Sequence, residues 1–132
     1  MIHFTANEVV VDRSRDEFIL VGFAELRNGD CRDALHFQRS YNVDQQDVVL
    51  GLNQVYVERC DQSRSCYGGI RRVELRSASV TVLFSDSNAE ILGDNQFEIE
   101  LAVTPATFDD IASGLAQIFA DSDIFSVADR WS

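Results

Sequence analysis

Apolar and polar residues alternate along most of the first hundred positions, which is the pattern of β-strands with one buried face. The alternation is clearest near Gln96–Val103, where Glu98 and Glu100 face away from the apolar side chains. The segment 17–26 is instead almost continuously apolar, which predicts a strand covered on both faces. Strands are predicted at Glu8–Asp12, 17–26, 34–41, 53–60, 70–76, 79–85 and 96–103.

The spacing of apolar residues along the chain changes after residue 103. Apolar side chains then recur at helical spacing and form one stripe, made by Phe108, Ile111, Leu115, Ile118 and Phe119. A helix is therefore predicted over 107–119, beginning at Thr104-Pro105 or at Thr107, because proline is favoured in the first helical turn and Thr107 has capping-box spacing to Asp110. A shorter helix around 88–92 is predicted to end at Gly93.

Together these elements predict an α+β fold, in which a single largely antiparallel sheet carries the C-terminal helix packed on one face. The apolar strand 17–26 offers the surface that the helix needs. The 132 residues fit a single domain, 1–132. The tail 121–132 is peripheral to this domain: it either docks as a last turn or forms part of a binding surface.

Glycine and cysteine positions add local predictions. Asn28-Gly29 is a strong hairpin signal, and Gly22 inside a strand indicates a bulge or close packing. Cys60 and Cys66 flank a polar turn, so they can pair only if their Cα atoms lie about 4.4–6.8 Å apart. The sequence leaves that pairing open.

The composition is 45% hydrophobic and 25% charged, which is typical of a globular protein and argues against disorder. No apolar run approaches the roughly 18 residues of a membrane span, so we expect no membrane partner. The first residues lack the basic and apolar regions of a signal peptide. A cytoplasmic location is therefore expected.

The charge is large and unevenly placed. All 11 basic residues are arginine, 22 residues are acidic, and the net charge is −11. Residues 1–76 hold 12 acids and 10 arginines, whereas residues 77–132 hold 10 acids and Arg130 alone. A negative field repels nucleic acid and attracts basic protein surfaces, although acidity also serves solubility alone.

Catalytic and metal-binding patterns are missing from the sequence. It contains no nucleophile elbow, P-loop, HExxH or GxGxxG motif. His3 and His36 lie far apart and have no CxxC partner, so neither a metal site nor a cofactor is expected. The protein is predicted not to be an enzyme.

Two short motifs stand out in the middle of the chain. In Tyr67-Gly68-Gly69 the glycines either supply a positive φ at the start of a strand or allow a partner's backbone to approach. In Gln46-Asp47 the carboxylate either caps a turn or makes an acidic contact.

The run from Gln46-Asp47-Val48-Val49-Leu50-Gly51 to Tyr67-Gly68-Gly69-Ile70 resembles the immunity protein 10 family of bacterial polymorphic toxin systems. The shared pattern is a QD-apolar-G step, a strand bearing a tyrosine, a variable turn, and Tyr-Gly-Gly before an apolar strand. This resemblance implies a cytoplasmic protein that binds and neutralises a cognate toxin. It also makes Asp47, Tyr67, Gly68 and Gly69 candidate contacts with that toxin.

Acidic side chains complete the candidate surface. Glu98 and Glu100 on one strand face are either solvated, part of a binding ladder, or, if buried, acid–base groups. With Asp109 and Asp110 they are predicted to steer the protein onto a basic surface of the toxin. The alternative function is a small acidic secretion chaperone or adaptor for an effector, although such proteins usually begin with a helix.

Overall fold

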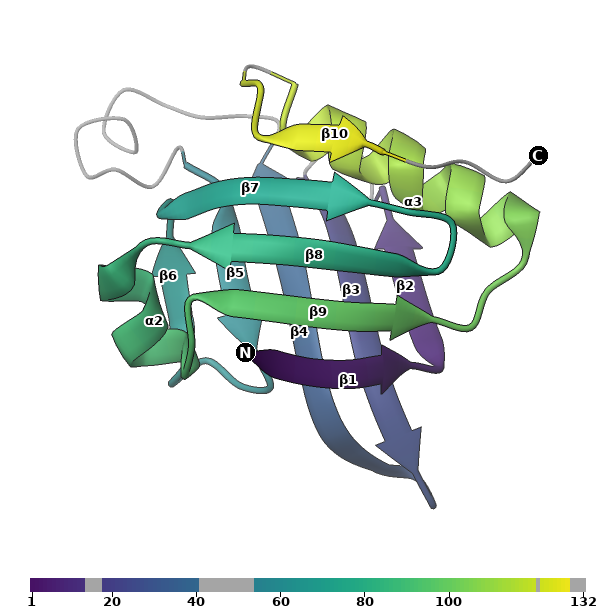
Figure 1. Ribbon diagram of the computed structural model, residues 1–132, viewed down its shortest axis with the longest axis horizontal. Helices are drawn as coiled ribbons and strands as arrows, with labels where there is room; N and C mark the ends of the chain where they lie inside the picture. Colours follow the sequence, from purple (N-terminus) through teal and green to yellow (C-terminus); the bar gives the residue numbers. More distant parts are fainter. Residues whose placement is uncertain (14–17, 41–53, 121, 129–132) are drawn as a thin grey trace.

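The computed structural model describes residues 1–13, 18–40, 54–120 and 122–128. Its strands form two five-stranded sheets that face each other, with their strands crossing steeply (Figure 1). Sheet A has the order β1-β9-β8-β7-β10 and sheet B the order β2-β3-β4-β5-β6. The prediction of α+β structure with a C-terminal helix is confirmed, whereas the prediction of a single sheet is wrong.

Sheet A joins the beginning of the chain to its second half. Its strands are β1 (Ile2–Ala6), β7 (Ile70–Leu75), β8 (Ser79–Phe84), β9 (Gln96–Leu101) and β10 (Phe125–Val127). The three central strands pair antiparallel. Both edge strands are parallel to their neighbours, β1 to β9 and β10 to β7.

Sheet B is an antiparallel meander. Its strands are β2 (Glu8–Asp12), β3 (Phe18–Arg27), β4 (Asp30–Ser40), β5 (Tyr56–Arg59) and β6 (Ser65–Tyr67). The hairpin tip between β3 and β4 is Asn28-Gly29, with φ of 53° and 84°, as the sequence predicts. Gly22 is not at a bulge: the register shift lies at Glu25/Leu26, and a Cβ on Gly22 would lie 3.3 Å from that of His36.

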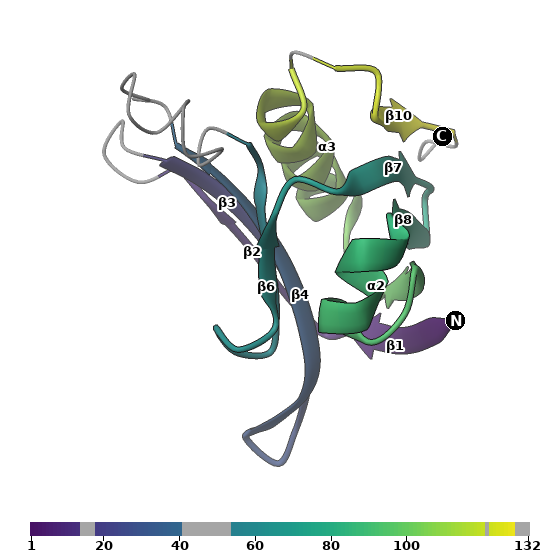
Figure 2. The same cartoon turned by 90° about the vertical axis from the view of Figure 1, so that its left-hand side faces the viewer.

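Two helices close the ends of the space between the sheets. The helix α3 (Pro105–Ile118) lies where the sheets diverge, and α2 (Asp86–Leu92) lies beside β6 (Figure 2). Thr104 caps α3 by accepting a hydrogen bond from the Thr107 amide, so the start at Thr104-Pro105 is correct and the start at Thr107 is wrong. Gly93 ends α2 with a φ of 106°.

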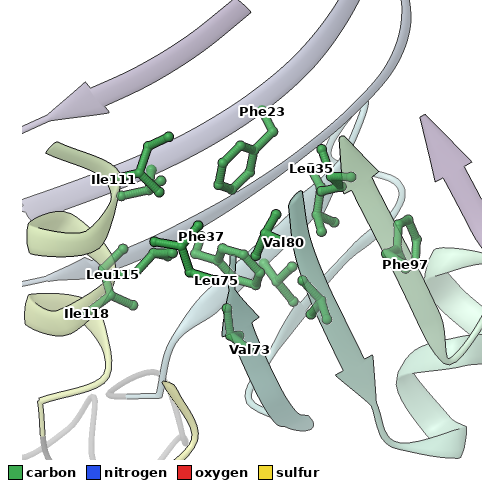
Figure 3. Close-up of a cluster of buried hydrophobic side chains, with 14 of the residues drawn as sticks. Phe23, Leu35, Phe37, Val73, Leu75, Val80, Phe97, Ile111, Leu115 and Ile118 are labelled. Atoms are coloured by element: carbon green, nitrogen blue, oxygen red, sulfur yellow. The ribbon is translucent and has the colours of Figure 1, made fainter. Parts of the chain in front are cut away.

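The core lies between the two sheets and under α3 (Figure 3). Phe23 and Phe37 of sheet B, Phe97 of sheet A and Leu115 of α3 are each at most 1% exposed. The helix stripe packs mainly against β3, as its sequence predicts. One 14-residue helix is too small to cover a ten-strand sheet, so the two sheets bury each other's apolar faces instead.

The prediction that strand 17–26 is covered on both faces is wrong. Ile19, Val21 and Phe23 point into the core, whereas Phe18 and Leu20 lie on the outer side and are half-buried. No described helix or strand covers that outer face (Figure 2). Its apolar residues are therefore available to something outside the described chain.

Candidate functional site

The Tyr67-Gly68-Gly69 motif forms the corner at which the chain leaves sheet B for sheet A. Both glycines have a φ of 72°, in the left-handed region. The Gly68 amide donates to the carbonyl of Val55 at 2.8 Å, and the Gly68 carbonyl accepts from Nδ2 of Asn88 at the same distance. The backbone of this corner is therefore held from both sides.

Neighbouring side chains occupy the places where larger residues would put a Cβ. A Cβ on Gly69 would lie 2.2 Å from Oδ1 of Asn88, which is 6% exposed. A Cβ on Gly68 would lie 1.7 Å from Oε1 of the exposed Gln54. The conformational interpretation of the two glycines is thus supported, and their contact with a partner stays a prediction.

The side chain of Tyr67 belongs to a second feature, the outer face of sheet B. The registers of β2 to β6 place side chains of five strands in rows on this face. We call it the aromatic face, and its residues are Val10, Leu20, Gly22, Ala24, Ala34, His36, Gln38, Tyr56, Glu58 and Tyr67. Glu8 and Asp12 lie at its β2 margin.

Three rings form the centre of the aromatic face. The ring of Tyr56 lies 5.2 Å from that of Tyr67 and 6.0 Å from that of His36, measured between centroids. The hydroxyl of Tyr56 donates to a carboxylate oxygen of Glu58 at 2.6 Å. Burial, followed by this hydrogen bond, raises the pKa of Tyr56. Burial also lowers the pKa of His36, while the negative charge of Glu58 acts in the opposite direction.

Two adjoining hollows open on this face. One, of about 180 Å³, lies over Gly22, Ala24 and Ala34, whose small side chains leave it open. The other, of about 450 Å³, lies beside Tyr56, Tyr67 and Glu58 and has a more polar lining. Leu20 and His36 line both hollows. An apolar recess and a polar recess therefore lie next to each other.

The predicted acidic pair lies on the opposite side of the molecule. Glu98 and Glu100 point outward from β9 on the outer face of sheet A, as their alternation predicts. Glu100 is 57% exposed, accepts from Thr5 Oγ1 at 3.3 Å and lies 3.3 Å from Nε2 of His3. Their position on an open sheet favours solvation or partner contact over acid–base catalysis, which needs burial.

The other candidate residues are not gathered with this pair. Asp109 and Asp110 are exposed in the first half of α3, and Asp47 lies outside the described residues. The sequence also left open a disulfide between Cys60 and Cys66. In the structure Cys66 lies opposite Val57 in the register, and both thiols are free. The structure thus separates the motif corner from the acids rather than joining them in one site.

The alternation within 34–41 and 53–60 assigns His36, Tyr56 and Glu58 to the sides of their strands opposite Leu35 and Val57, but it does not collect them into a surface. Periodicity assigns a residue to a face, whereas only strand pairing brings faces of different strands together. Leu20 was missed altogether because its strand was interpreted as covered on both sides. One signal in the sequence could have indicated this surface: two tyrosines, Tyr56 and Tyr67, lie on either side of one short turn.

Within the described ranges, no group of three or more His, Cys, Asp or Glu side chains is arranged to hold a metal ion. Neither described helix has the length and hydrophobicity needed to cross a bilayer. No curated protein and no solved structure is significantly similar to the chain. The family model of immunity protein 10, however, matches residues 5–109, from β1 into α3. The chain belongs to the immunity protein 10 family.

Proposed function

We propose that this protein binds a cognate bacterial toxin domain in the cytoplasm and neutralises it. Its membership in the immunity protein 10 family carries the proposal, since the match runs through both sheets. The family's name indicates protection by a protein inhibitor, so the protein acts by binding rather than by catalysis of its own.

The surface of the described chain suits such a partner. Both sheets present outer faces with polar or aromatic side chains, and the net charge of −11 favours encounter with a basic protein surface. Of the acids predicted to steer this encounter, Glu98, Glu100, Asp109 and Asp110 are placed on solvent-facing positions. A toxin domain with a basic surface around its active site is therefore the expected partner.

The proposal is tested with the product of a toxin gene adjacent to the gene for this protein. The toxin domain is expressed in a bacterial host with and without this protein, and growth is followed. We expect arrest with the toxin alone, recovery on co-expression, and co-purification of the two chains. A toxin domain that neither binds this protein nor loses its toxicity would overturn the proposal.

A further inference from the structure

The aromatic face combines apolar exposure with negative charge. Val10 is 45% exposed and Tyr67 48% exposed, at the two edge strands β2 and β6. Between them lie the two hollows and the half-buried Leu20 and Tyr56. Tyrosines in such a setting offer large contact area at a small cost in side-chain entropy, which is why they are enriched at protein interfaces.

Among the residues that the structure describes, the charged side chains in the rows of this face are all acidic. The rows and their margin contain the carboxylates of Glu8, Asp12 and Glu58 and no arginine. Arg59, although adjacent to Glu58 in β5, points the other way and pairs with Asp33. An apolar surface bordered by carboxylates complements a basic partner rather than a second acidic one.

The outer face of sheet A differs mainly in lacking exposed aromatic side chains among the described residues, and part of its charge is paired. Its β7 region carries Glu74 between Arg72 and Arg76, so its charges are largely paired there. Its β9 region carries Glu98 and Glu100 beside Ser79 and Thr81 of β8, without an exposed aromatic cluster among the described residues. This face has charge but lacks the aromatic anchors that give protein interfaces most of their affinity.

We infer that the aromatic face is the docking surface for the toxin, and that the toxin presents there a basic side chain next to an aliphatic one. The aliphatic side chain enters the hollow over Gly22, which is bounded by Val10, Leu20 and Ala34. The arginine or lysine lies against the tyrosine rings near Glu58, where the ring faces and the carboxylate both favour a cation. This inference rests on the proposed function and specifies its contact surface.

The test measures binding of a catalytically inactivated toxin domain, encoded beside this protein, to three variants by calorimetry. Leu20→Arg and Tyr67→Arg each put a cation on the aromatic face. We expect each to raise the dissociation constant by about 30-fold or more, the scale of an interface hot spot. The matched control is Thr81→Arg on the outer face of sheet A, which is expected to change it by less than about threefold. Circular dichroism confirms that each variant is folded.

Two milder variants keep the test decisive where an added arginine prevents folding. Val10→Ser and Tyr67→Ser remove exposed side chains, and each should weaken binding by about 5-fold or more. Wild-type affinity in all folded variants of the aromatic face would overturn the inference while leaving the proposed function intact. Failure of the wild-type protein to bind the toxin would instead count against the proposed function.

Sedimentation of the protein alone tests whether a second copy of this chain, rather than the toxin, occupies the aromatic face. We expect a monomer at micromolar concentration, because the carboxylates of two aromatic faces would repel each other. A dimer that Leu20→Arg converts to a monomer would show that this face is a self-association surface and would overturn the inference.

Discussion

Arg59 joins three parts of the structure through one guanidinium group. Its Nε and one terminal nitrogen lie 3.1 and 3.0 Å from the two carboxylate oxygens of Asp33, in the neighbouring strand of sheet B. The other terminal nitrogen donates to the carbonyl of Leu92 at 2.7 Å, in the last turn of α2. The guanidinium carbon also lies 5.3 Å from the ring centroid of Phe97 in sheet A. The hydrogen bond to Asp33 raises the pKa of Arg59 more than burial lowers it.

The substitution Arg59→Met removes this charge but keeps an apolar stem over Phe97. It leaves the carboxylate of Asp33 without its cation in a site where the two side chains are only 16% and 14% exposed. Breaking a fully buried pair costs about 3–5 kcal/mol. Because residual solvent screens this site, we expect a loss of about 2–4 kcal/mol in the free energy of unfolding.

Equilibrium unfolding in urea, followed by circular dichroism, measures this loss. The matched control is Arg72→Met, which breaks an ion pair with Glu74 in which the arginine is 58% exposed; it should cost less than about 1 kcal/mol. Adding Asp33→Leu to Arg59→Met should restore part of the stability, because no unpaired carboxylate remains. A loss below about 0.5 kcal/mol for Arg59→Met, or strict additivity in the double variant, would refute this argument.

Three further changes test the core, the corner and the acids. Leu115→Ala truncates a fully buried side chain of the apolar stripe of α3 and should cost about 2–5 kcal/mol in urea unfolding. A loss typical of surface sites, below about 0.5 kcal/mol, would contradict the packing of the helix. Gly69→Ala should cost about 1–3 kcal/mol, because φ is 72° and the new Cβ would collide with Asn88, and unchanged stability would disprove the need for glycine there. Neutralising Glu98 and Glu100 together should slow toxin association at low salt in stopped-flow measurements and leave stability nearly unchanged. Association at the wild-type rate would remove this strand face as the steering surface.

Most of the local structure could be predicted from the pattern of the sequence, because each element has one buried side. The alternation near 96–101 identified the inward Phe97 and Ile99, both fully buried. The proline correctly indicated a start of α3 at Thr104-Pro105, whereas the capping-box spacing of Thr107 pointed to the wrong start. The strand Ile2–Ala6 was missed although its apolar positions also alternate, since a five-residue strand gives few repeats to recognise.

The division into two sheets could not be predicted in the same way. Alternation fixes which side of a strand is buried but does not identify the strand beside it. The chain begins in sheet A with β1, crosses to sheet B at Asn7 and returns at Gly68-Gly69. The parallel pairings of β1 with β9 and of β10 with β7 join segments far apart in sequence, for which no turn signal exists.

The same limitation explains which part of the candidate surface the sequence revealed. Tyr67 was found through its motif, whereas its contact with Tyr56, and the contact of Tyr56 with His36, depend on the registers of three strands. The acidic residues were found by counting charges along the sequence, which does not depend on how the strands pair. Charge therefore led to a prediction about the kind of partner, whereas the fold was needed to bring the aromatic side chains together on one surface.

The two outer faces can serve one binding event because charge and contact act at different ranges. Glu98 and Glu100 lie on the opposite side of the molecule from the aromatic face, so we expect their charge to reach an approaching basic protein mainly at low salt. The Debye length is about 30 Å at 0.01 M ionic strength but only about 8 Å at physiological strength. The proposed anchors, such as Tyr67, are expected to act only after contact and mainly to slow dissociation. We therefore expect variants of sheet A's acids to change the association rate in a salt-dependent way. Variants of the aromatic face should change the dissociation rate at every salt concentration. If variants of sheet A's acids changed the dissociation rate instead, and variants of the aromatic face did not, the toxin would dock on sheet A.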